Sequence, residues 1–185
     1  MKKTILLPSL LFSVFFFLNS CAFLSQKKLD LIQWPADIYY MEAVCELNIA
    51  WNNTQYSGDM SIKLDYPDML FLEVYGPFGD TIFSIQKNRD SFVMLAGNDK
   101  TTSERQFIDL FKMTINDFID DISIKGTRQQ GLGSGFYIQK EQYRVTYALN
   151  NREDKMCWIN PDGTMCIRFI EAKFNKGQSI GKGSN

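Results

Sequence analysis

Apolar and polar residues alternate along the chain from Ala43 to Ala96, and this pattern restricts the fold more than any other feature. Between Ala43 and Trp51 apolar side chains recur at every second position, and the alternation returns over Tyr56–Leu64 after Asn52-Asn53. A period of two indicates strands with one buried face and one solvated face. The short polar link between the two stretches predicts a β-hairpin.

Three further strands are predicted to continue an antiparallel meander. They cover Met69–Tyr75, Thr81–Lys87 and Ser91–Ala96, and residues typical of turns separate them. The charged Glu73 lies on one face of the first of these strands, so we expect the opposite face to be buried.

The hydrophobic period then changes to that of a helix, near residues 103–123. Ser103-x-x-Gln106 has the pattern of a capping box, and Phe107 begins an apolar face with helical spacing. Thr114-x-x-Asp117 predicts a second helix start. Four more strands are predicted to follow, over Phe136–Gln139, Tyr143–Leu149, Lys155–Asn160 and Thr164–Phe174. The chain is therefore mainly β, with two inserted helices.

The N-terminus has the composition of a secretion signal. Lys2 and Lys3 precede a largely apolar stretch that is too short to span a bilayer comfortably. The following Leu18-Asn19-Ser20-Cys21 resembles the lipobox of bacterial lipoproteins, which implies cleavage before Cys21 and lipid on that residue. A secretory signal with a chance cysteine at its end is the alternative. Ala22 is not the aspartate that resembles an inner-membrane retention signal, so we expect the outer membrane.

These features divide the chain into four parts. We expect residues 1–20 to be a cleaved signal peptide and residues 21–41 to be a lipidated N-terminus and tether. We expect residues 42–175 to form the β domain, with its helices near 103–123, and residues 176–185 to form a disordered tail.

The composition argues against an enzyme and against nucleic-acid binding. The chain has no histidine, which removes the commonest general base and metal ligand, and it has no basic stripe. Asp117, Asp120 and Asp121 are spaced as a solvated helix face rather than a metal site. The loop Gly131-x-Gly133-x-Gly135 precedes a strand, whereas a phosphate loop opens a helix. We expect no metal and no cofactor.

Cys157 and Cys166 flank the turn signal Asn160-Pro161-Asp162-Gly163. If Asn160 faces Gly163, the two cysteines lie opposite each other and a disulfide is possible. A three-residue loop with a bulge would shift the register by one residue and point them to opposite faces. Both registers remain open, and Cys45 is expected to be a buried apolar residue.

An aromatic residue lies at the centre of the connection Gly76-Pro77-Phe78-Gly79. Loops usually face water, so a phenylalanine there is unexpected. Phe78 either projects outward or folds back to plug the end of the sheet.

Together with the lipobox and the meander, several motifs resemble the LolB family of outer-membrane lipoprotein receptors. They are the strand ending in Gly76-Pro77-Phe78-Gly79, the following Thr-x-Phe-x-Ile, and the helical stretch from Phe107 to Gly126. The resemblance implies an open, strongly curved antiparallel sheet, an incomplete barrel that covers short helices and an apolar cavity. It also implies that acylated lipoproteins arrive from a periplasmic LolA-like carrier and enter the inner leaflet of the outer membrane. The loop residue matched by Phe78 would engage that leaflet.

We expect the protein to be a monomer. Apolar side chains on the expected inner face of the sheet would line this cavity. The candidates are Leu47, Ile49, Met60, Ile62, Leu70, Leu72, Val74, Phe83, Ile85, Phe111 and Phe118. A lipid-anchored scaffold of the same fold, with a self-filled cavity, is the second hypothesis. A lipid-modifying enzyme is a remote third, which the missing histidine argues against.

Overall fold

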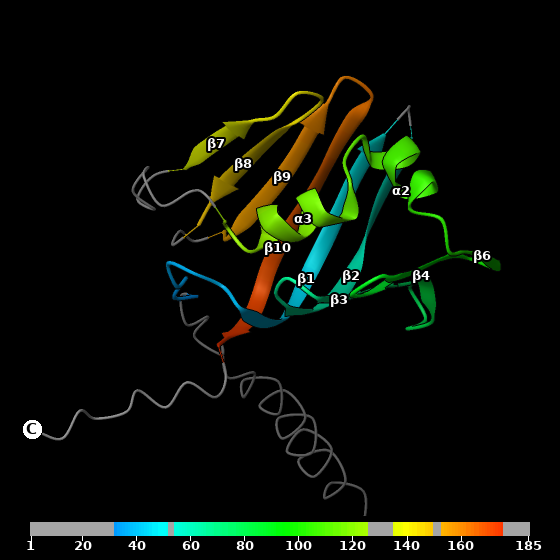
Figure 1. Cartoon of the computed structure of the whole chain (residues 1–185), viewed down its shortest axis with the longest axis horizontal. Helices are drawn as coiled ribbons and strands as arrows, with labels where there is room; N and C mark the ends of the chain where they lie inside the picture. Colours follow the sequence, from blue (N-terminus) through cyan, green and yellow to red (C-terminus); the bar gives the residue numbers. More distant parts are fainter. Residues whose placement is uncertain (1–31, 52–53, 126–134, 150–152, 176–185) are drawn as a thin grey trace, which may run out of the picture. The chain divides into compact units, whose positions relative to one another are not determined.

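The computed structural model describes residues 32–51, 54–125, 135–149 and 153–175 (Figure 1). The expected signal peptide, Cys21, the glycine loop up to Ser134 and the expected tail lie outside the described residues. None of the helices in the described ranges is long and apolar enough to cross a membrane.

A single ten-stranded antiparallel sheet forms the domain, with the strand order β6-β5-β4-β3-β2-β1-β10-β9-β8-β7. The strands are β1 (Tyr40–Trp51), β2 (Thr54–Asp65), β3 (Met69–Tyr75), β4 (Thr81–Asn88), β5 (Ser91–Ala96), β6 (Asp99–Thr101), β7 (Phe136–Gln139), β8 (Arg144–Ala148), β9 (Lys155–Asn160) and β10 (Gly163–Phe174). β6 and β7 are the two edges and do not pair with each other, so the sheet is open. The predicted fold class is confirmed.

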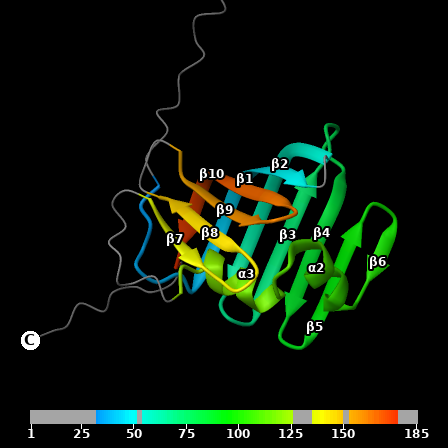
Figure 2. The same ribbon diagram turned by 90° about the horizontal axis from the view of Figure 1, so that it is seen from above.

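Two short helices, α2 (Glu104–Phe111) and α3 (Ile115–Ile122), lie against one face of the sheet, which curves around them (Figure 2). Thr114 and Asp117 form the predicted capping box at the start of α3. Ser103 caps α2 by accepting a hydrogen bond from the backbone N–H of Arg105 at 3.3 Å, rather than from that of Gln106.

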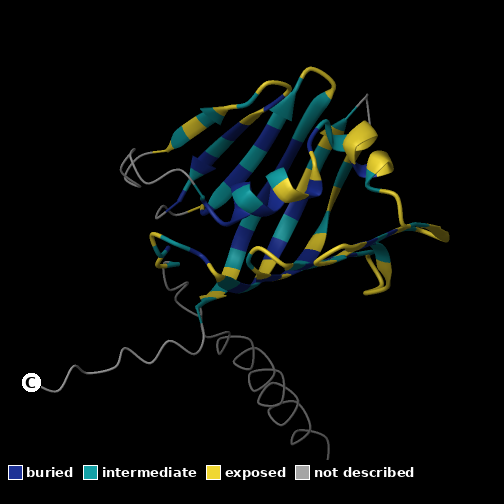
Figure 3. Cartoon of the chain, in the orientation of Figure 1, coloured by how far each residue is buried: buried dark blue, intermediate teal, exposed yellow. Residues whose placement is uncertain are grey.

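The core lies between the helices and the inner face of the sheet. Buried positions alternate with less buried ones along β1 and β3, as a period of two requires (Figure 3). Phe107, Phe118 and Ile122 cover this face from the helices. The predicted faces of the strands are therefore the observed ones.

The domain begins earlier in the chain than residue 42. β1 starts at Tyr40, and Trp34 and Ile38 before it are buried. The part of the expected tether that the structure describes is thus packed on the domain. The alternation rule missed this segment because its residues are irregular in conformation and are held by side chains far away in the sequence. Strand β6 was also missed, since it has three residues with no apolar pattern.

The β9–β10 hairpin adopts the first of the two registers considered above. Asn160 pairs with Gly163, which leaves a two-residue turn and brings Cys157 opposite Cys166. Their Cα atoms are 4.1 Å apart and a disulfide joins them. Cys45 is a buried free cysteine, and burial raises the pKa of its thiol far above the usual range.

Candidate functional site

An apolar cavity of about 210 Å³ lies between the two helices and the inner face of the sheet. Its walls come from strands β1 to β4 and β10 and from both helices. The lining residues are Leu47, Ile49, Tyr56, Met60, Leu72, Val74, Ile82, Phe83, Ile85, Phe107, Phe111, Phe118, Met165 and Ile167. Tyr56 brings a hydroxyl group to this wall, and that group donates a hydrogen bond to the backbone oxygen of Tyr75 at 2.9 Å. The surface left to a ligand is therefore apolar.

Nine of the eleven predicted lining residues lie on this cavity; Ile62 and Leu70 do not. Both are almost completely buried and belong to the filled part of the core. Alternation identifies the face on which a side chain lies, but it does not reveal whether neighbouring groups fill the space above that face.

Ile82 was missed because the strand that carries it is irregular. Val74 pairs with Phe83 and Tyr75 pairs with Thr81, so Ile82 is an extra residue in a β-bulge. The bulge allows Ile82 and Phe83, which are consecutive, to line the same cavity. Strict alternation would have placed Ile82 on the opposite face.

The position of the Tyr56 ring depends on a glycine two residues away. A Cβ atom on Gly58 would lie 2.1 Å from the hydroxyl oxygen of Tyr56, so the tyrosine lies across the backbone of Gly58. A larger residue at position 58 would displace this ring from the cavity wall. Phe107, Met165 and Ile167 complete the set of residues that the sequence pattern left out.

The cavity reaches solvent at one end of the sheet, which we call the loop end. Five of its lining residues are only partly buried there: Ile49, Tyr56, Ile82, Phe83 and Phe111. This end also carries the β3–β4 loop, since Tyr56 bonds to Tyr75 and a Cβ atom added to Gly76 would lie only 3.0 Å from Ile82.

Phe78 projects from this loop and is 95% exposed, so it does not fold back as a plug. The N–H of Gly79 donates to the oxygen of Gly76 at 3.0 Å, and the N–H of Gly76 donates to the oxygen of Asp80 at 2.8 Å. Pro77 suits the second position of such a turn, and Gly79 has a φ of 82°, which a residue with a Cβ rarely adopts. The loop is a compact turn that presents one aromatic ring next to the cavity mouth.

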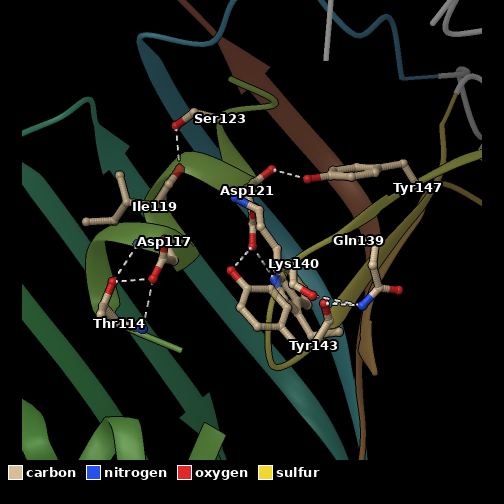
Figure 4. A network of polar contacts seen from close by, with 10 residues as sticks. Thr114, Asp117, Ile119, Asp121, Ser123, Gln139, Lys140, Tyr143 and Tyr147 are labelled. Atoms are coloured by element: carbon tan, nitrogen blue, oxygen red, sulfur yellow. Dashed lines mark hydrogen bonds and ion pairs between the residues drawn. The ribbon is translucent and has the colours of Figure 1, made fainter. Parts of the chain in front are cut away.

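A buried polar network fixes α3 to the far half of the sheet (Figure 4). Oδ2 of Asp121 accepts hydrogen bonds from the hydroxyl of Tyr143 and the indole N–H of Trp158, both at 3.0 Å. Nζ of Lys140 lies 3.5 Å from Oδ1, and the hydroxyl of Tyr147 donates to the backbone oxygen of Asp121. These bonds connect α3 to β8 and β9 and so position the helix that carries Phe118.

The prediction that Asp121 lies on a solvated helix face is wrong, because its side chain is almost completely buried. Burial raises the pKa of Asp121, while the hydrogen bond from Trp158, the charge of Lys140 and the hydrogen bond from Tyr143 act in the opposite direction. Asp117 serves the capping box instead. No group of metal-binding side chains occurs within the described part of the chain.

Comparison with known proteins yields structural similarity but no match in sequence. No family model matches this chain, and no curated protein does. Among solved structures, the chain is similar to a LolA superfamily protein from Nitrosomonas europaea, with 7% sequence identity and a TM-score of 0.44. The superposition covers 78% of this chain and 89% of the other.

Proposed function

We propose that this domain binds the acyl chains of lipidated proteins in its cavity and releases them into a membrane. Acyl chains consist of methylene groups without hydrogen-bonding atoms, so hydrophobic walls are sufficient to bind them. The observation that carries the proposal is the apolar cavity, whose one described hydroxyl, on Tyr56, is already bonded to the backbone.

The finer proposal is a LolB-like receptor. Its lipidated Cys21 would hold it at the periplasmic side of the outer membrane, and a LolA-like carrier would supply acylated lipoproteins. Phe78 supports this proposal because an exposed aromatic ring next to the cavity mouth suits a bilayer interface. Transfer would require no energy-consuming site, since the chains would move from a small cavity to a larger apolar phase.

The size of the cavity favours binding of part of one acyl chain at a time. Its volume of about 210 Å³ is below the roughly 300–1,000 Å³ that is common for small-molecule pockets. A larger ligand would need the wall to move. α2 is the candidate, because its C-terminal end is held by an exposed ion pair between Lys112 and Asp162 and a 3.5 Å hydrogen bond from Asn160.

The same small volume favours the second candidate, a lipid-anchored scaffold without transfer activity. In that case the cavity would be a packing defect between helices and sheet. The two candidates differ in whether the isolated domain binds an acyl chain at all.

Binding of a fluorescent triacylated lipopeptide to the anchor-free protein tests this directly. The protein should retain Trp34, because that residue is part of the domain. Val74→Phe places a larger side chain on the cavity wall and should weaken binding about tenfold, which corresponds to about 1.4 kcal/mol. Val44→Phe is the matched control, since Val44 is exposed on the opposite face of β1. Equal binding by both variants would show that the cavity is not the binding site, and absence of binding by the parent protein would favour the scaffold.

Release is tested separately with Phe78→Glu. This variant should bind the lipopeptide normally but fail to deliver it to liposomes, because a carboxylate at the tip opposes contact with the apolar layer. Unchanged delivery would show that the loop has no part in release.

A further inference from the structure

The segment before β1 is fixed to the end of the sheet away from the loop Gly76–Gly79. Trp34 is buried, and its ring centroid lies 4.9 Å from that of Phe169 and 5.1 Å from that of Phe174. Its indole N–H donates to Oδ1 of Asp154 at 2.7 Å. This single side chain therefore contacts the end of β10 and the residue before β9.

Asn175 holds the same segment from the other end of the chain. Its Oδ1 accepts hydrogen bonds from the backbone N–H groups of Tyr39 and Tyr40 at 3.0 and 3.1 Å, and its Nδ2 donates to the oxygen of Asp37 at 2.9 Å. Ile38 between them is fully buried. Ile32 also packs against the core, and we call residues 32–40 the N-terminal clamp.

We propose that the N-terminal clamp sets the length and the exit point of the lipid tether, and so limits how the cavity mouth can approach the bilayer. The inference rests on the proposed function, because it takes Cys21 as the lipidated residue. Without the clamp the tether would extend to the start of β1 at Tyr40. With the clamp it ends at Ile32, at the end of the sheet away from Phe78.

The strand register gives the distance between the N-terminal clamp and the tip of the loop at Phe78. Trp34 packs on Phe174, which pairs with Met41, whereas Val74 at the base of the loop is level with Cys45 through Met60. Val74 is thus four residues further along and three strands across. With about 3.3 Å per residue and about 4.8 Å per strand, and with the extension to Phe78, the clamp and the loop tip are about 30 Å apart.

An orientation in which the loop touches the bilayer and the N-terminal clamp lies above it therefore needs a tether at least about 30 Å long. The 11 peptide units from Cys21 to Ile32 span at most about 38 Å. Removal of residues 23–28 would leave at most about 18 Å, which excludes this orientation. Release of Trp34, and of Ile32 before it, in that variant would make Ile38 the first fixed residue, so the tether could again span about 38 Å.

The experiment uses the full lipidated chain in vesicles of phosphatidylethanolamine and phosphatidylglycerol, with the fluorescent triacylated lipopeptide as probe. Deletion of residues 23–28 should slow delivery to the bilayer at least fivefold and leave probe binding unchanged. Replacement of the same six residues by glycine and serine should have no effect, because the length is kept. Addition of Trp34→Ala to the deletion should restore delivery.

Normal delivery by the deletion variant would overturn the proposal, as would loss of delivery after the glycine–serine replacement. Failure of Trp34→Ala to restore delivery would also overturn it. If that variant does not fold, Phe174→Ala releases the clamp by removing the ring on which Trp34 packs. Failure of the proposed function looks different, since the parent protein would then not bind the probe or would not deliver it.

Discussion

Replacement of Asp121 by alanine should destabilise the domain by about 3 kcal/mol. The substitution leaves the buried indole N–H of Trp158 and the hydroxyl of Tyr143 without the acceptor that they share. Each buried donor without a partner costs about 1–3 kcal/mol, which gives roughly 2–6 kcal/mol for the pair. The lower half of this range applies, because alanine also removes a carboxylate that is unfavourable to bury, as its raised pKa indicates.

Asp121→Asn is the matched control. Its amide oxygen can accept the same two hydrogen bonds that Oδ2 accepts now, so the expected loss is within about 1 kcal/mol. Urea unfolding followed by tryptophan fluorescence measures both variants. With a slope of about 2 kcal/mol per molar, the midpoint should fall by about 1.5 M for alanine and by no more than about 0.5 M for asparagine.

Two results would refute this reasoning. An alanine variant that unfolds at the parent midpoint would show that the network does not hold α3 to β8 and β9. An asparagine variant as unstable as the alanine variant would show that the negative charge matters and the hydrogen bonds do not. The ring of Phe118 lies 4.9 Å from that of Trp158, so the alanine variant should also bind the acyl probe more weakly.

Three further predictions concern pH, the disulfide and the loop. Burial raises the pKa of Asp121 above its ordinary value of 3.8, so the folded state binds a proton on this carboxylate more tightly than the unfolded chain does. The stability of the parent relative to Asp121→Asn should therefore be greatest below pH 3.8 and should fall as pH rises through the raised pKa. Urea midpoints measured between about pH 3 and pH 7 test this. Reduction of the Cys157–Cys166 disulfide, which closes a sequence separation of 9, should cost about 2–3 kcal/mol in thermal or urea unfolding; a Cys157→Ser/Cys166→Ser variant that is unaffected by reductant is the control. Gly79→Ala should destabilise the protein by about 1 kcal/mol in urea unfolding, because the φ of 82° is unfavourable for alanine. A Cβ atom at position 79 would meet no atom within 4 Å, so crowding does not contribute, and a variant as stable as the parent would argue against the conformational explanation.

Much of the fold could be predicted from the sequence because periodicity is a local property. Alternation placed β3 to β5 to within one residue and β1 and β2 to within three, and the capping box at Thr114 marked the start of α3. The turn at Asn160–Gly163 limited the cysteine pair to two registers, but the choice between them depended on how β10 pairs with β9. Identification of the inner face also placed most of the cavity lining correctly.

Tertiary structure decided the features that depend on contacts between segments far apart in the sequence. Ile82 lines the cavity because of a bulge that forms only when β4 pairs with β3. Asp121 is buried because Tyr143, just before β8, and Trp158, in β9, supply donors for its carboxylate. Trp34 joins the domain because Asp154, 120 residues away, accepts its indole N–H. The sequence by itself determined which residues form strands and helices and which faces are apolar, whereas only chain folding determined where space remained between those faces.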